Sequence, residues 1–148
     1  MDDKDGFVDL GNARSEEQKK VMEAIATEGE CPFCRENLAK YHKKPIILSG
    51  LYWILTENQW PYENTRVHLL LIATVHAEKI SDVPSEAGEE RWRFLRFAER
   101  EYGVNIGAAC MRFGWKKDSG AATVRHLHEH FIVPVENPPE AVKFKIGK

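Results

Sequence analysis

The stretch 126–134, with the sequence HLHEHFIVP, constrains the fold of this 148-residue chain more than any other part of it. Histidine occupies three alternating positions, His126, His128 and His130, and a branched and aromatic run follows them. This pattern is typical of a β-strand, in which successive side chains point to opposite faces of a sheet. The three imidazoles are therefore predicted to share one face, and Glu129 is predicted to point to the other.

The residues alone leave three interpretations of this histidine row open. It is a solvated strand face, or it is a metal site, because a His-x-His pair on a strand suits zinc. Alternatively, one neutral imidazole is a nucleophile that attacks phosphorus. The small residues within 118–126 let backbone N–H groups approach an anion, and Arg112, Lys116 and Lys117 lie just upstream. These features favour a phosphate ester, although an ordinary tight turn explains the small residues equally well.

Composition and charge exclude several classes of protein. The chain has the length of one domain, and 43% of its residues are hydrophobic, which is enough for a packed core. Its formal charge of −2 predicts no bulk attraction to nucleic acid or to an anionic membrane surface. No apolar run approaches the roughly 20 residues that span a bilayer. The acidic stretch 1–10 lacks the apolar core of a secretory signal, so we predict a cytoplasmic location.

The local patterns predict three helices and five strands. Ser15 followed by Gln18 is typical of a capping box that opens a helix, and Gly29 is a plausible end for it. Branched and aromatic runs predict the strands. Residues 1–14 are polar and are expected to lack regular structure. The predicted helices are 15–29, 36–42 and about 86–102, and the predicted strands are 45–50, 51–58, 66–76, 104–114 and 123–134.

The order of these elements predicts the fold class. Strands lie on both sides of one long helix without strict βαβ alternation, which favours an α+β fold with a mainly antiparallel sheet and a short N-terminal helix. We interpret 1–29 as an N-terminal extension and 30–148 as a single domain. The residues predicted to form the core face of the long helix, from their helical spacing, are Trp92, Leu95, Ala98 and Tyr102.

Cys31 and Cys34 form a Cys-x-x-Cys pair, which in a cytosolic chain is more often metal-binding or redox-active than a structural disulfide. A redox pair usually opens a helix after a strand, whereas the residues before Cys31 are predicted to be helical. Zinc requires two further ligands, and two buried thiols without a metal remain an alternative. Cys110 is expected to be a core thiol, and His42 and His68 are expected to be surface or core residues.

The stretch 126–134 resembles the His-φ-His-φ-His-φ-φ motif of the histidine triad family of nucleotide hydrolases and transferases. The resemblance covers about residues 30–134 and implies a histidine triad fold, with a small antiparallel sheet and helices, and a homodimer. The other segments similar to stretches of that family are 58–62, 68–83, 103–107 and 120–125.

The resemblance implies a role for each histidine of the triad. His128 attacks the α-phosphorus of a nucleotide and forms a nucleotidyl-imidazole intermediate, which water resolves, or phosphate in a phosphorylase. His130 holds phosphate oxygens, and His126 completes the triad. The residues implied to contact the nucleotide or its phosphate are Asn58, Asn105, Gly120 and Thr123.

The same resemblance implies a structural zinc, because several branches of the family carry one next to a Cys-x-x-Cys pair. This implies a separate role for each histidine: His126 binds the metal, His128 attacks phosphorus and His130 contacts phosphate oxygens. The implied zinc ligands are Cys31, Cys34, His76 and His126.

We therefore expect an enzyme that cleaves a dinucleoside polyphosphate or a nucleoside phosphoramidate through a covalent intermediate. Ala122 stands where many family members have a phosphate-contacting glutamine, so a non-catalytic nucleotide-binding module remains an alternative. A zinc-dependent hydrolase with the histidine row as its ligands is another. Glu129 stands where the family is usually apolar, and a charge on that face requires solvent, a partner or a salt bridge.

Overall fold

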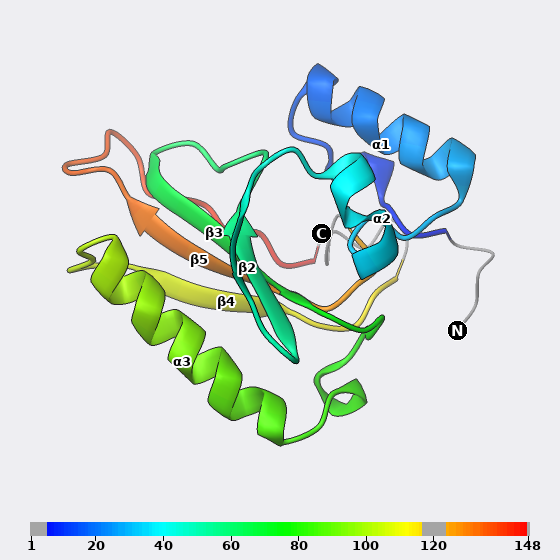
Figure 1. Ribbon diagram of the computed structural model, residues 1–148. Coiled ribbons are helices and arrows are strands. Elements are labelled where there is room, and N and C mark those ends of the chain that lie inside the picture. Colours follow the sequence, from blue (N-terminus) through cyan, green and yellow to red (C-terminus); the bar gives the residue numbers. More distant parts are fainter. Residues whose placement is uncertain (1–5, 117–123, 148) are drawn as a thin grey trace.

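The fold is a five-stranded antiparallel sheet with helices packed on both faces (Figure 1). The computed structural model describes residues 6–116 and 124–147. In the described part of the chain, no helix is long and apolar enough to cross a membrane. The strand order is β1-β2-β3-β5-β4, which confirms the predicted α+β class. The strands are β1 (Ile46–Ser49), β2 (Trp53–Glu57), β3 (Thr65–Ala73), β4 (Ala108–Arg112) and β5 (His128–Pro134). The helices are α1 (Glu16–Glu28), α2 (Arg35–Tyr41) and α3 (Glu86–Glu101). Two 3-10 turns, η2 (Leu10–Asn12) and η3 (Ile80–Asp82), are also present.

The central strand β3 is buried on both faces because its residues alternate between two apolar clusters. Leu69 and Leu71 belong to the cluster on the side of α3. Leu70 and Ile72 instead pack with Leu38 of α2 on the opposite side. A strand that is covered on both faces reads as a continuous apolar run, which is why the sequence of β3 shows no polar alternation.

The register of β5 against β3 decides which way each catalytic candidate faces. His130 lies opposite Leu70, and His128 lies opposite Ile72. Residues that are directly opposite in an antiparallel pair share a face of the sheet. Both histidines therefore face the side of α2, and Glu129, which lies between them, faces α3.

Several strands are shorter than the sequence predicts. β3 ends at Ala73, β5 begins only at His128, and β4 omits the first residues of the predicted run 104–114. The backbone N–H of Leu127 donates to the segment that follows β3, at 2.6 Å, instead of entering the ladder. The prediction that all three histidines share one strand face is therefore wrong for His126, which precedes the strand.

Helix α3 packs on the sheet through a face that is rotated from the predicted one. Leu95 and Tyr102 are half-buried against the core, as expected, but Trp92 is 61% exposed and its predicted place was wrong. The physical reason is Glu90, whose carboxylate accepts the backbone N–H groups of 51–53 at 2.8–3.0 Å. A prediction from apolar residues at helical spacing cannot detect a buried carboxylate. The buried residues of α3 are Ala87, Glu90, Phe94 and Ala98.

Glu129, which no sequence pattern explains, is fully buried and pairs with Arg91 of α3. Arg91 Nε donates to one carboxylate oxygen at 2.6 Å, and Nη2 donates to the other at 2.5 Å. Bidentate pairs of this kind are the strongest charge-assisted hydrogen bonds in proteins. The pair joins β5 to the helix that covers its far face.

Replacing Arg91 with alanine is expected to lower the free energy of unfolding by about 3–5 kcal/mol, because it leaves the Glu129 carboxylate buried without its partner. Urea denaturation measures the change. The matched control is Arg93→Ala, which removes an exposed arginine from the same helix and should change stability by less than about 0.5 kcal/mol. Equal effects of the two substitutions would contradict a stabilising role for the pair.

The N-terminal segment is more ordered than predicted. Val8 is buried and forms an isolated bridge with Val124, and η2 follows it. Helix α1 begins as predicted, with the N–H of Gln18 donating to Ser15 Oγ at 3.0 Å. The Gln18 side chain accepts from the N–H of Arg14 instead of closing the capping box on Ser15. The division of the chain into an extension and a domain remains a prediction.

Candidate active site

His128 and His130 line a cavity of about 90 Å³ between the sheet and the N-terminal helices. Leu70 of β3 and Met22 of α1 are among the apolar residues that line the cavity. Phe33, from the Cys-x-x-Cys loop, presents its edge to the His128 ring with the centroids 5.2 Å apart. Three separate parts of the chain thus enclose the two histidines.

His128 is held in one tautomer by a backbone carbonyl. Its Nδ1 lies 2.6 Å from the carbonyl oxygen of His126, so Nδ1–H donates and the lone pair is on Nε2. Burial lowers the pKa of His128 to about 4, with a further contribution from the charge of Arg112. The imidazole is therefore neutral near pH 7, which is the form that acts as a nucleophile.

His130 belongs to a chain of hydrogen bonds that also fixes its tautomer. The backbone N–H of Tyr62 donates to His68 Nδ1 at 3.1 Å, so the proton of His68 is on Nε2. This N–H donates to His130 Nδ1 at 2.8 Å, which leaves the proton of His130 on Nε2. Burial lowers the pKa of His68 to about 3 and that of His130 well below its usual value, so both rings are neutral.

The Nε2 atom of His130 is buried and has no hydrogen-bond partner among the described residues. A buried donor without an acceptor is costly, and such groups are uncommon in folded proteins. A phosphate oxygen in the cavity that His130 shares with His128 can accept this hydrogen bond. The site therefore combines a nucleophilic nitrogen with a donor for an anionic ligand.

Asn58 lies directly beside these histidines. Its side-chain oxygen accepts the backbone N–H of Trp60 at 2.7 Å, and its amide nitrogen lies 3.1 Å from His68 Nε2. The side chain is buried and lines the cavity. Asn58 is thus placed within reach of a ligand, and its predicted contact to a nucleotide remains a prediction.

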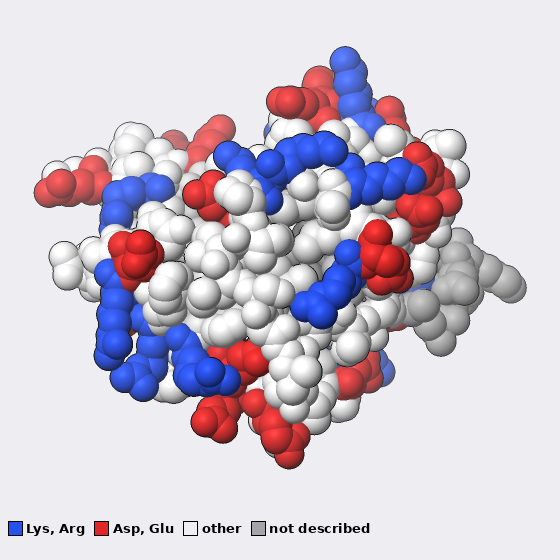
Figure 2. Space-filling model, in the orientation of Figure 1, with Lys and Arg blue, Asp and Glu red and all other residues white. Residues whose placement is uncertain are grey.

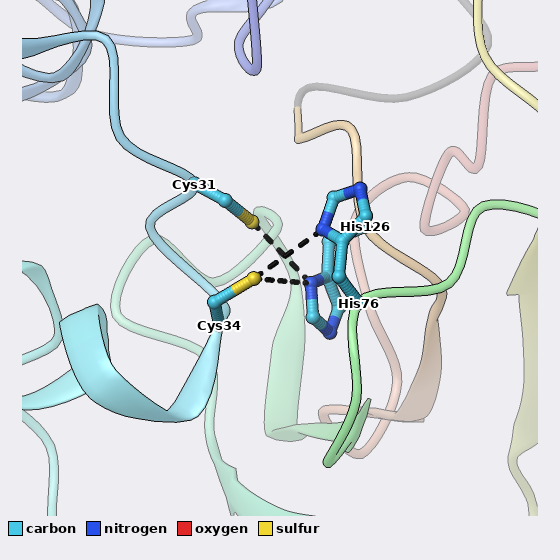
Figure 3. Close-up of side chains that lie close together, drawn as sticks. All are labelled: Cys31, Cys34, His76 and His126. Carbon is cyan, nitrogen blue, oxygen red and sulfur yellow. Dashed lines mark hydrogen bonds between the residues drawn. The ribbon is translucent and has the colours of Figure 1, made fainter. Parts of the chain in front are cut away.

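A second cluster brings together the four residues implied as zinc ligands (Figure 3). Their ligand atoms all lie within 4.8 Å of one another. The two thiols come from the loop before α2, and the two imidazoles come from the segments after β3 and before β5. The members of this cluster are Cys31, Cys34, His76 and His126.

Three of the separations within the cluster are close to those of tetrahedral zinc. Bond lengths of about 2.3 Å to sulfur and about 2.0–2.1 Å to nitrogen place the ligand atoms roughly 3.4–3.8 Å apart. Cys31 Sγ lies 3.3 Å from His126 Nδ1, and Cys34 Sγ lies 3.3 Å from His76 Nδ1 and 3.7 Å from His126 Nδ1. The donor set of two sulfurs and two nitrogens is one that structural zinc prefers.

The surroundings of the cluster also suit a metal. His126 Nε2 donates to the carbonyl of Ala73 at 2.7 Å, which turns the lone pair on Nδ1 toward the thiols. Burial lowers the pKa of His126 to about 4, so the ring is neutral, as a ligand must be. Burial raises the pKa of both thiols, that of Cys34 to about 12, so a metal that binds them displaces their protons.

Of the other predicted substrate contacts, Asn105 is described and is not brought to the cavity. Asn105 is exposed between α3 and β4, and it lines neither this cavity nor the larger one beside it. Gly120 and Thr123, with Ala122 between them, lie outside the described residues. Their predicted contacts to phosphate therefore remain predictions.

His68 is the functional candidate that the sequence analysis did not identify. It was grouped with His42, which instead bonds to Thr56 at 2.7 Å, as a surface or core residue. The available signal was its position in the stretch 68–83, which resembles a stretch of the histidine triad family. Its contact with His130 spans 62 residues of sequence, so no local pattern could reveal it.

The described sheet thus carries a His-x-His pair on an inner strand, and this pair faces a cavity. No family model and no curated protein matches the sequence. Among solved structures, the chain is similar to a histidine triad protein from Clostridium difficile, with 17% identity and a TM-score of 0.56 over 75% of this chain and 95% of that one.

Two further similar structures carry more specific descriptions. One is a Zn-bound histidine triad family protein from Mycobacterium smegmatis, with 20% identity, a TM-score of 0.56, and coverage of 79% of this chain and 82% of that one. The other is a diadenosine triphosphate hydrolase from Plasmodium falciparum in complex with Cyclomarin A, with 16% identity, a TM-score of 0.52 and 65% coverage of each chain. The chain therefore has the histidine triad fold, and the resemblance seen in the sequence is confirmed at the level of the fold.

Proposed function

We propose that the chain is a nucleotidyl hydrolase or transferase of the histidine triad type, with His128 as its nucleophile. The observation that supports this most is the pairing, in one cavity, of a neutral His128 with its lone pair on Nε2 and a buried His130 N–H without a described partner. A solved structure with the same fold is a diadenosine triphosphate hydrolase, which agrees with nucleotide chemistry.

In the first step, the Nε2 lone pair of His128 attacks the α-phosphorus of the nucleotide and an N–P bond forms. The bond from phosphorus to the leaving group breaks, and the leaving group departs with that electron pair and takes up a proton from water. The imidazole becomes cationic, and its Nδ1–H bond to the His126 carbonyl stabilises the charge.

In the second step, water attacks the same phosphorus and the N–P bond breaks. Its electron pair returns to Nε2, and the attacking water loses a proton to the solvent. Phosphate or another acceptor in place of water makes the same step a phosphorolysis or a transfer. In both steps His130 Nε2–H donates to a non-bridging phosphate oxygen, and His68 holds His130 in the tautomer that permits this.

The apolar cavity beside His128 suits a nucleoside, but it is small. Small-molecule sites usually measure about 300–1,000 Å³, whereas this cavity measures about 90 Å³. Met22, Val21 and Ile25 of α1 line one side of it. Nucleoside binding in this proposal therefore displaces side chains of α1.

We also propose that Cys31, Cys34, His76 and His126 hold a structural zinc. When bound, zinc ties the N-terminal loop to the start of the catalytic strand, which stabilises the fold. The second candidate function, a hydrolase with zinc on the histidine row, is less well supported. His130 Nδ1 accepts from His68 and its Nε2 carries the proton, so this ring offers no lone pair to a metal, and His126 belongs to the cluster with Cys31 and Cys34 instead.

The test is turnover of adenosine phosphoramidate and of diadenosine tetraphosphate by the wild-type protein. The reaction is stopped with base, which preserves an N–P bond, and the modified peptide is identified by mass spectrometry. We expect adenylate release and an adenylyl group on His128. Tight nucleotide binding without turnover of either substrate would instead support a non-catalytic module and would overturn the proposal.

The homodimer and the cytoplasmic location remain predictions. Strand β4 is at one edge of the described sheet, and Ile106 and Phe113 beside it are 74% and 61% exposed. An edge strand flanked by exposed apolar residues is suited to pairing with a second copy. This agrees with the homodimer that the family resemblance implies.

A further inference from the structure

A second and larger cavity, of about 660 Å³, adjoins the one that contains the catalytic candidates. It is formed by the turn between η2 and α1, the loop between β2 and β3, the end of β4 and the C-terminal segment 140–145. The two cavities are adjacent, because six residues line both of them. These shared residues are Arg14, Gln18, Gln59, Trp60, Tyr62 and Arg112.

The charge of this second cavity is opposite to that of the whole chain. Its lining contains four cationic side chains and only two carboxylates, whereas the chain carries a formal charge of −2. On the face drawn in Figure 2, positive and negative side chains are interspersed around an uncharged centre. The cations that gather in the cavity are Arg14, Arg112, Lys143 and Lys145, and the carboxylates are Glu63 and Glu140.

The two arginines are held close to the triad by aromatic rings. The guanidinium of Arg14 lies over the Tyr62 ring, 4.6 Å from its centroid, and it bonds to the Trp60 carbonyl. The Tyr62 ring in turn stacks on His130, with the centroids 5.6 Å apart. The charges of Arg14 and Arg112 both contribute to the lowered pKa of His130, although burial is the larger cause.

The C-terminal segment completes the cavity from the other side. Arg112 donates to the carbonyl oxygen of Lys145 at 2.5 Å, and its guanidinium lies 3.9 Å from the centroid of the Phe144 ring. Phe144 also presents its edge to His130, with the centroids 5.4 Å apart. These contacts hold the backbone of this segment beside the site, and the exposed Lys143 and Lys145 line the second cavity.

We propose that this second cavity, the anion chamber, binds the leaving group of the reaction and that this leaving group is a chain of phosphates. The inference rests on the proposed function, and it selects nucleoside and dinucleoside polyphosphates over phosphoramidates as substrates. When the bond between the α-phosphorus and the bridging oxygen breaks, its electron pair stays on that oxygen. The departing polyphosphate thus gains negative charge next to cations already in place, which stabilises the transition state.

The test compares two substrates that share an adenylyl group and differ in the leaving group. Adenosine phosphoramidate releases ammonia, whereas diadenosine tetraphosphate releases a nucleoside triphosphate, whose phosphates are negatively charged. The double variant Lys143→Gln/Lys145→Gln is expected to lower the ratio of kcat/KM for the tetraphosphate to that for the phosphoramidate at least about tenfold. The matched control, Arg96→Gln/Arg100→Gln, removes the same charge from exposed positions of α3 and should leave the ratio within about twofold.

The outcomes separate this inference from the proposed function. If the wild type cleaves both substrates and the chamber variant keeps the wild-type ratio, the inference is overturned and the proposed function stands. If the chamber variant loses only the phosphate-dependent reaction, which forms a nucleoside diphosphate, the chamber holds the attacking phosphate. This outcome also overturns the inference. If neither substrate is cleaved, the proposed function fails. Calorimetry with inorganic tripolyphosphate then decides whether the chamber binds polyphosphate. If it does, the chamber variant loses binding of tripolyphosphate and the control variant retains it.

Discussion

Replacing His128 with alanine is expected to lower kcat/KM for adenosine phosphoramidate by at least about 10⁴-fold, because removing a nucleophile removes the covalent path altogether. The loss should appear in kcat, and the adenylyl group that is trapped on the wild type should be absent. Stopped assays with product separation measure the rate, and mass spectrometry measures the intermediate.

The smaller variant His128→Gly provides a control for damage to the fold. It leaves a space at the position of the ring, and added imidazole is then expected to restore part of the turnover. Rescue separates a missing nucleophile from a disturbed structure, and urea denaturation reports the stability of both variants. Turnover by His128→Ala at the wild-type rate would refute the assignment of His128.

Replacing Cys31 or Cys34 with serine is expected to release one zinc ion per chain and to lower the free energy of unfolding by at least about 3 kcal/mol, because the binding energy of a structural metal is folding energy. Metal analysis and urea denaturation measure the two effects. The matched control is Cys110→Ser, which removes a half-buried thiol from β4 outside the cluster and should retain the zinc.

The order of events on chelation distinguishes a structural metal from a catalytic one. A structural zinc predicts that turnover declines together with the folded fraction. Immediate loss of turnover in a protein that stays folded would instead favour the zinc-dependent hydrolase. If the wild-type protein contains no metal and is only as stable as Cys31→Ser, then Cys31 and Cys34 are two buried thiols that hold no metal.

The two predictions are connected through His126. Its ring belongs to the metal cluster, and its backbone carbonyl accepts the hydrogen bond that sets the tautomer of His128. Loss of the metal is therefore expected to disturb the nucleophile together with the fold, and not before it. A single residue thus links the stability of the N-terminal loop to the chemistry of the cavity.

Local patterns predicted much of the fold correctly, and their failures have physical causes. Apolar runs located β2, β3 and the long helix α3, because burial requires such runs wherever an element is covered. They failed for Trp92, because a buried Glu90 bonded to three backbone N–H groups sets the packed face of α3. They also failed for the start of β5, where a contact with the segment after β3 replaces the ladder.

The sequence by itself determined the chemistry that is available to this protein: imidazoles at alternating positions, a Cys-x-x-Cys pair and a single charged residue within the triad stretch. Only the tertiary structure decided how these groups are used. It turned His126 toward the thiols, brought His68 within hydrogen-bond distance of His130, and placed Arg91 against Glu129. These contacts join residues that are 95, 62 and 38 positions apart, so they depend on how the strands and helices pack and not on any local period.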